Sequence, residues 1–392
     1  MLIYVTSSAS AQTVSTVVSG FSVDALAVDA AGNIYASDFF GTSSDPNNPN
    51  GTKVRKISPD GSTVSVVDSS FFAPTGLAFD ATGNLFVAGT DGKISKVTFG
   101  TSGSTTTTFA SSLSDLGGLA FDKSGNLYAA QYSGNKIYKI TSGGTVSTLV
   151  ASGLNGPVAL TFANDTLYAA NFNDGNIYKV SATGALTFVA DVMTLAQFAL
   201  PVGYMVFSGG NLLVNVGSYT SSTTSVGNRI YKVTLNGQTS VFSGTGVSGE
   251  TNGAVATATY AGNNGMALSP TGDTLYISEA NGKRIRRITG LNASSAAPKN
   301  GAKNPQGFLL EQNYPNPFNP STVISYQLLI AGQVSLKVFD MLGREVATLV
   351  DAKQAVGNHS VNFNAANLTS GVYLYTLNAG SFSDTKKMLL VK

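Results

Sequence analysis

Oxygen-bearing side chains recur at one place in the first three hundred residues. Asp38, Gln131, Asn171 and Glu279 each stand three residues after an aromatic residue that lies in a short apolar run. Carboxylate and amide oxygens are the ligands that a hard cation such as Ca²⁺ takes, at about 2.3–2.6 Å. If the fold brings these runs side by side, the four side chains form one polar ring that could hold a metal or a small polar ligand.

Other kinds of chemistry lack the residues they need. The sequence has no cysteine and one histidine, His359, which excludes disulfides, cysteine nucleophiles and histidine-rich zinc sites. It has no nucleophile elbow, phosphate-binding loop, dinucleotide fingerprint or metalloprotease helix. The 23 basic and 21 acidic residues nearly balance and form no basic stripe, so nucleic acid is not an expected partner. With no run of 18 apolar residues, the sequence predicts no transmembrane segment.

The aromatic runs belong to an internal repeat. Its phrase is a short apolar strand, an Asp-x-x-Gly-Asn turn and a second apolar strand with the aromatic residue. Three clear and three weaker copies are Ala25–Tyr35, Gly76–Phe86, Gly118–Tyr128, Ala159–Tyr168, Tyr204–Leu213 and Gly265–Tyr276. A third strand and a Thr/Val-rich fourth strand follow most copies. Four strands at a spacing of mostly about 40–50 residues predict a six-bladed β-propeller.

The strand count predicts how the ring closes. The sixth copy ends near Thr289 after three strands, and a spare strand, Thr13–Val18, precedes the first copy. We therefore expect this N-terminal strand to complete the sixth blade, because closure removes the open sheet edges that invite aggregation.

Propeller geometry then defines a candidate site. The Asp-x-x-Gly-Asn turns share one face, while the loops into the first strands and out of the second strands surround the channel on the other. The predicted rim positions after the second strands are Asp38, Gly89, Gln131, Asn171, Val216 and Glu279. With residues just before the first strands, the candidate ligand-binding set is Asp24, Asp38, Gln131, Asn155, Asn171, Asn264 and Glu279. Asp38 and Glu279 are the candidate ligands of a divalent metal such as calcium; the alternative is that these groups only solvate the channel mouth.

Irregular insertions are predicted on the same face, where loops on a rigid scaffold often bind ligands. They are Gly41–Thr52, Val192–Pro201, Gly217–Asn228 and Thr245–Asn263. Phe198, Tyr219 and Tyr260 are candidates for contact with a glycan or protein, or for packing within the loops. The densest basic cluster lies on a strand that points Arg284 and Arg286 one way and Arg287 the other, so we assign it no catalytic role.

The last part of the chain has its own pattern. A polar run over 292–306 predicts a flexible linker. The proline-rich run Asn313–Thr322 and a series of short alternating strands follow, with Gly343, Gly357 and Gly371 at the breaks. About seven strands in this length predict a small immunoglobulin-like β-sandwich. The fold class is therefore all-β, with a six-bladed propeller followed by a sandwich.

Two family resemblances rest on these residues. The segment Gly244–Ile288 resembles an NHL repeat, and residues 12–291 resemble the NHL and SMP-30/gluconolactonase-like group of six-bladed propellers. In the tail, the motifs Asn313–Thr322, Val338–Val346, Ser370–Tyr373 and Lys386–Lys392 resemble the type A sorting domain of the type IX secretion system. The tail resemblance implies a translocon and a sortase as partners, and a secreted or cell-surface protein of a Bacteroidetes-type bacterium.

These observations predict four segments and a leading function. The segments are a signal-peptide remnant over 1–11, ending in the cleavage pattern Ala9–Ala11, the propeller over 12–291, the linker over 292–306 and the sorting domain over 307–392. The leading hypothesis is a binding propeller for a glycan, peptide or protein. The alternative, from the SMP-30-like resemblance, is a metal-dependent lactonase or related hydrolase. A lyase acting on a cyclic peptide rests on fold analogy alone.

Overall fold

A computed structural model describes residues 12–39, 41, 51–101, 103–193, 202–217, 227–291, 309–310, 312–313, 316–328, 332–355, 357–380 and 382–391. These residues are all β, and they form two compact units, within residues 8–294 and 295–392. No helix in these ranges has the length and hydropathy needed to cross a membrane. The predicted signal-peptide remnant and linker lie outside the described residues.

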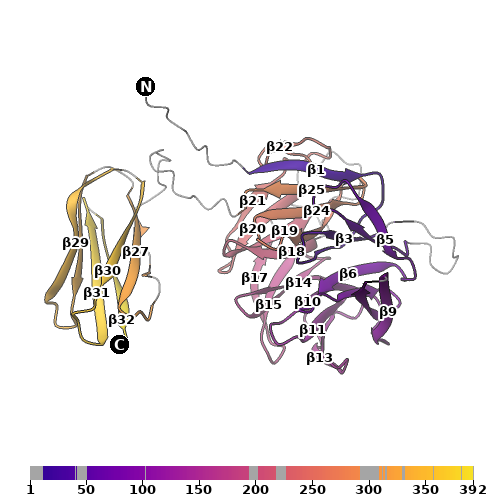
Figure 1. Cartoon of the computed structure of the whole chain (residues 1–392), viewed down its shortest axis with the longest axis horizontal. Coiled ribbons are helices and arrows are strands. Elements are labelled where there is room, and N and C mark those ends of the chain that lie inside the picture. The colour runs from indigo at the N-terminus through magenta and orange to yellow at the C-terminus, as the bar shows by residue number, and fades with distance from the viewer. Residues whose placement is uncertain are drawn as a thin grey trace. The chain divides into compact units, whose positions relative to one another are not determined.

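The first unit is a ring of six antiparallel sheets, each with its first strand innermost (Figure 1). Blades 1 to 3 comprise β2 (Leu26–Val28), β3 (Ile34–Ser37), β4 (Val54–Ile57) and β5 (Val64–Asp68); β6 (Pro74–Phe79), β7 (Leu85–Gly89), β8 (Ile94–Gly100) and β9 (Gly103–Ala110); and β10 (Leu116–Phe121), β11 (Leu127–Gln131), β12 (Lys136–Ile140) and β13 (Val146–Val150). The first strands of adjacent blades contact one another all the way round the ring, so they line its axis.

Blades 4 to 6 complete the ring. They comprise β14 (Pro157–Ala163), β15 (Thr166–Asn171), β16 (Asn176–Val180) and β17 (Leu186–Asp191); β18 (Val202–Ser208), β19 (Asn211–Val216), β20 (Arg229–Thr234) and β21 (Thr239–Ser243); and β23 (Asn263–Leu268), β24 (Thr274–Glu279), β25 (Arg284–Thr289) and β1 (Thr13–Ser19). The six-bladed prediction is confirmed.

The N-terminal strand closes the ring as predicted. β1 lies alongside β25 in antiparallel register, from Thr13 opposite Thr289 to Ser19 opposite Arg284 (Figure 1). A two-residue strand that the sequence did not reveal, β22 (Gly253–Ala254), pairs with the other edge of β1 at its first two residues. Part of the insertion before blade 6 therefore covers the edge that closure would otherwise leave open.

Adjacent blades are joined by aromatic pairs. The second-strand aromatic of one blade meets an inner-strand phenylalanine of the next edge to face, with ring centroids 4.9 Å apart for Tyr35 and Phe79 and 5.0 Å apart for Phe86 and Phe121. Tyr128 of blade 3 and Phe162 of blade 4 repeat the contact at 5.3 Å. Such pairs add about 0.5–1.5 kcal/mol each beyond the area they bury.

The Asp-x-x-Gly-Asn turns act as turn formers, as the sequence predicts. In the first, Asp29 Oδ1 accepts hydrogen bonds from the backbone N–H groups of Ala31 and Asn33, at 3.0 and 2.8 Å. Gly32 takes a φ of +86°, which costs a glycine nothing. These carboxylates are therefore engaged in shaping the hairpins between first and second strands.

The second unit is a C-terminal β domain of two antiparallel sheets that share one apolar core. One sheet contains β26 (Leu309–Leu310), β27 (Ser321–Leu328) and β30 (Gly357–Asn364); the other contains β28 (Gly332–Phe339), β29 (Glu345–Gln354), β31 (Gly371–Ala379) and β32 (Phe382–Leu390). His359 stacks on Tyr326 with ring centroids 5.3 Å apart, which is a packing role. The finer assignment to an immunoglobulin-like sandwich stays a prediction.

Candidate functional site

The rim groups lie at the ends of the second strands, as predicted, and three of them, Asp38, Gln131 and Glu279, turn toward the third strand of their own blade. Asp38 Oδ2 pairs with Arg55 Nη1 at 3.2 Å, and its Oδ1 accepts the Lys53 N–H at 2.6 Å. Gln131 Oε1 accepts the Tyr138 hydroxyl at 2.9 Å. These contacts hold neighbouring strands together, and we call these pairs the rim braces.

Glu279 forms the most buried rim brace. It and Arg286 are both fully buried, with Glu279 Oε1 2.8 Å from Arg286 Nη1, and Arg284 Nε lies 3.2 Å from the other carboxylate oxygen. Burial raises the pKa of Glu279, and the two guanidinium groups oppose that rise. The sequence placed Arg284 and Arg286 on one face of the strand, and the structure confirms it.

Arg286 also orders the insertion before blade 6. Its guanidinium donates to the carbonyls of Thr259 and Thr251, at 3.1 and 2.9 Å, and to Asn252 Oδ1 at 2.9 Å. It lies over the ring of Tyr260, which is fully buried. Of the two alternatives for Tyr260, the structure supports packing within the loop, because the ring is buried between the loop and the strand. The other two aromatic candidates, Phe198 and Tyr219, lie outside the described residues.

Both rim carboxylates that were candidate metal ligands are held in ion pairs. Burial raises the pKa of Asp38, against the opposing effects of the Lys53 N–H and Arg55, and both Asp38 and Glu279 already bind arginine. Across the described ranges, no three histidine or acidic side chains gather close enough to hold a metal ion together. Metal binding by Asp38 and Glu279 stays a prediction that these ion pairs do not favour.

A chain of polar contacts joins blades 5, 6 and 1 beside the channel. Asn263 donates to Asn215, Asn215 Nδ2 donates to the Asn264 carbonyl at 2.9 Å, and Asn264 Nδ2 donates to Asp24. Burial raises the pKa of Asp24 to about 7, although the Asn264 hydrogen bond acts in the opposite direction. The sequence prediction included Asp24 and Asn264 but missed Asn215. The available signal was that Asn215 is an amide at a second-strand position where the other five blades carry alanine or serine, as at Ala88.

The predicted set therefore does not form a single ring of ligands. Asp24 and Asn264 come together, while Asn155 is exposed and accepts a hydrogen bond from Asn173 Nδ2 at 3.0 Å. Asn171 is buried and donates to Asp174 Oδ2 at 3.3 Å. Its role in binding, like that of the whole set, stays a prediction.

One tyrosine spans the central channel. The pairing register aligns Tyr204 of β18 with small residues in the other five inner strands, namely Ala25, Gly76, Gly118, Ala159 and Gly265. Its hydroxyl donates to the carbonyl of Thr75 in blade 2, at 2.7 Å. A Cβ on Gly118 of blade 3 would lie 3.3 Å from its ring, so the small residues make room for the one large side chain.

Blade 2 lacks the rim brace, and a pocket opens there. Gly89 occupies the rim position, and Ser95, opposite Val87, takes the third-strand place that Arg286 or Tyr138 has in other blades. The resulting pocket of about 270 Å³ is lined by Asp91, Lys93 and Thr107 among others. Lys93 Nζ pairs with Asp91 Oδ2 at 2.8 Å at its edge.

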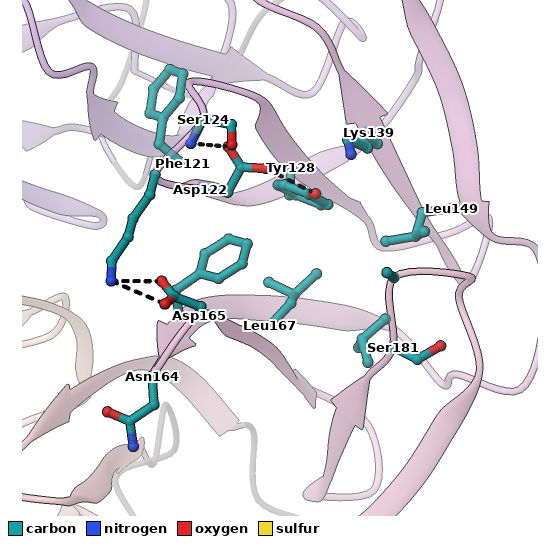
Figure 2. A pocket seen from close by; sticks show the side chains of 14 residues that line it. Phe121, Asp122, Ser124, Tyr128, Lys139, Leu149, Asn164, Asp165, Leu167 and Ser181 are labelled. Atoms are coloured by element: carbon teal, nitrogen blue, oxygen red, sulfur yellow. Dashed lines mark hydrogen bonds and ion pairs between the residues drawn. The ribbon is translucent and has the colours of Figure 1, made fainter. Parts of the chain in front are cut away.

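A larger groove lies between blades 3 and 4, beside the Asp-x-x-Gly-Asn turns (Figure 2). Its volume is about 710 Å³. Figure 2 shows Asp122, Tyr128 and Lys139 along one side of the groove and Asp165, Leu167 and Ser181 along the other. It combines aromatic and aliphatic walls with exposed polar groups, which is the usual make-up of a small-molecule site.

Comparison with known proteins supports both units. Residues 21–173 match the SMP-30/gluconolactonase/LRE-like region, and residues 312–392 match the secretion system C-terminal sorting domain. A search of curated proteins finds no match. The chain therefore carries an SMP-30-like propeller and a type IX sorting domain, and the protein is exported to the cell surface or secreted.

Solved structures share the propeller fold at low identity. A protein of unknown function from Bacteroides thetaiotaomicron is 20% identical, with a TM-score of 0.56 over 71% of this chain and 76% of that one. An auxiliary nutrient binding protein from Bacteroides ovatus is 13% identical, with a TM-score of 0.56 over the same shares. A gluconolactonase from Xanthomonas campestris is 14% identical, with a TM-score of 0.51 over 71% of this chain and 90% of that one.

The Glu279–Arg286 brace predicts a large effect of one substitution. Arg286→Met removes the buried partner of Glu279 Oε1 and leaves the carboxylate only Arg284, at 3.2 Å, and we expect it to lower the free energy of unfolding by about 3–5 kcal/mol. Hydrogen exchange should also show lost protection around Thr251 in the insertion. The matched control is Arg287→Met on the opposite side of the strand, and the double variant Glu279→Leu with Arg286→Met should recover part of the loss. Equal effects of the two single variants would contradict the brace.

The raised pKa of Asp24 predicts a pH-dependent effect. Its folded-state pKa of about 7 exceeds the ordinary value of 3.8, so the folded state binds the extra proton between these pH values and loses stability as the pH rises through them. Asp24→Asn removes this loss. We therefore expect the free energy of unfolding of the variant, relative to that of wild type, to rise by roughly 1–4 kcal/mol between pH 4 and pH 8. Calorimetric unfolding across this range tests it, with exposed Asp351→Asn as control. A stability difference independent of pH would contradict it.

Proposed function

We propose that the protein is an exported binding protein, whose propeller holds a small ligand outside the cell and whose C-terminal domain supplies the export route. The observation that carries this proposal is the state of the rim acids. Asp38 and Glu279 are held by Arg55 and Arg286, so they brace strands instead of presenting free carboxylates to a substrate. Open concave surface lies elsewhere, above all in the groove between blades 3 and 4.

Two solved structures with a similar fold carry names that correspond to the proposed function and to its rival. Among similar folds, the Bacteroides ovatus protein is named for nutrient binding and the Xanthomonas campestris protein for gluconolactonase activity. At 13–14% identity these likenesses establish the fold alone. The rim braces favour the binding class for this chain, because a lactonase of the SMP-30-like kind needs its carboxylate and amide ligands free to hold a divalent metal.

The proposal assigns binding and export to different parts of the chain. Residues 12–291 form the exported binding domain. Residues 307–392 form the sorting signal that the translocon and sortase recognise. The linker over 292–306 would be the place where the two are separated. The match of residues 312–392 to a sorting domain supports this division.

A hydrolysis assay tests the binding proposal against its rival. The purified full chain is incubated with a panel of aldonolactones and esters in the presence of Ca²⁺, Mn²⁺ or Zn²⁺. We expect no turnover above the uncatalysed rate, because both rim carboxylates are engaged by arginine. Metal-dependent turnover that disappears in Asp38→Asn or Glu279→Gln, but persists in Asp351→Asn, would show that the protein is a hydrolase.

A further inference from the structure

We propose that the groove between blades 3 and 4 binds a neutral saccharide. This inference rests on the proposed function and names its ligand class and its place. The site differs from the rim predicted from the sequence, because it lies beside the turns at the opposite ends of the second strands.

The groove lies beside a bulge in the fourth strand of blade 3. Each fourth strand carries an extra residue in a bulge opposite the third strand; it is Phe109 in β9 of blade 2, Leu149 in β13 of blade 3, phenylalanine again in blade 5, and valine in blades 1, 4 and 6. Phe109 packs edge to face on Phe86 with centroids 4.9 Å apart. A Cβ on Gly144 of blade 3 would lie 3.9 Å from the Phe109 ring, so that ring reaches the turn of the next blade. Leu149 is shorter, and the groove opens beside it (Figure 2).

The walls present apolar surface to a ligand. Phe162 and Leu149 are partly exposed, and Leu167 and Tyr128 lie behind them in the same apolar cluster. Tyr128 and Phe162 meet edge to face, which holds both rings in fixed orientations. Pyranose rings carry C–H groups on their faces, and such faces pack well against aromatic and aliphatic side chains.

The edge of the groove carries positive and negative side chains in equal number. Lys123 pairs with Asp165 across the blade boundary, with its Nζ 2.8 Å from Oδ1 and 3.0 Å from Oδ2. On the blade 3 side, Lys139 Nζ lies 5.6 Å from the Tyr128 ring, above the hairpin that Asp122 shapes. Two ammonium groups and two carboxylates leave no net charge to attract an ion. They do offer donors and acceptors together, which suits the hydroxyls of a neutral sugar.

The Lys123–Asp165 pair can exchange partners at little cost. Its side chains are 82% and 63% exposed, and ion pairs of that kind contribute about 0–1 kcal/mol to stability. Sugar hydroxyls could therefore replace each partner of the pair without a large penalty. The volume of about 710 Å³ lies within the range of about 300–1,000 Å³ that is usual for small-molecule sites.

Calorimetric titration of the full chain tests the proposal. The probes are neutral gluco-, manno- and xylo-oligosaccharides, with oligogalacturonides and a tryptic casein digest as acidic-sugar and peptide comparators. We expect at least one neutral oligosaccharide to bind. Leu149→Phe fills the groove with the residue type found at the same bulge in blade 2, and should weaken that binding at least about tenfold. Asp165→Ala should weaken it several-fold.

The matched control is Phe109→Leu, which alters the equivalent bulge one blade earlier and should leave saccharide affinity unchanged. Thermal unfolding of each variant separates lost binding from lost fold. Binding that Leu149→Phe leaves intact would overturn the groove as the site while leaving the proposed binding function standing. Binding of only the acidic sugars or the peptides, or of none of the probes, would overturn the neutral saccharide as ligand. Lactone turnover in the separate hydrolysis assay would instead overturn the proposed function.

Discussion

Each blade of the propeller depends on the next through a contact between its second strand and the neighbour's inner strand. Tyr35 with Phe79 begins this series, and it ends where Tyr276 of blade 6 and Val28 of blade 1 share an apolar cluster. The series has no free end because β1 completes blade 6 and brings the chain back to its start. Stability of the ring is thus shared among six similar interfaces, and a local change in side-chain size opens space at one interface without breaking the others.

This constraint governs where chemistry is available. In three blades the end of the second strand is tied to the third strand, because Asp38, Gln131 and Glu279 contact Arg55, Tyr138 and Arg286. Tyr204 occupies the channel itself, where five other blades have glycine or alanine. Concave surface lies elsewhere: beside Gly89, which lacks a brace, and beside Leu149, where blade 2 carries Phe109. The rim residues that the sequence offers as ligand-binding candidates make contacts within the fold, and their role in binding stays a prediction.

Much of the fold could be predicted because its signals are local and repeated. The turn motif, the alternating strands and the spare strand Thr13–Val18 determine the blade count and the closure. The rim positions were also correctly located, but their partners were not visible. Arg55 stands 17 residues after Asp38, beyond an insertion, and Arg286 pairs with Glu279 only through the register of β24 and β25. The groove is harder still, since Leu149 matters only once a bulge aligns it with Phe109.

The central claim is that the rim acids Asp38 and Glu279 act as braces between second and third strands. A crystal structure of the full chain grown with millimolar calcium chloride tests it most directly. We predict that Asp38 keeps its ion pair with Arg55, that Glu279 keeps its pair with Arg286, and that no cation binds at the mouth of the central channel. A calcium ion about 2.3–2.6 Å from both carboxylates, with the two arginines displaced, would contradict the account.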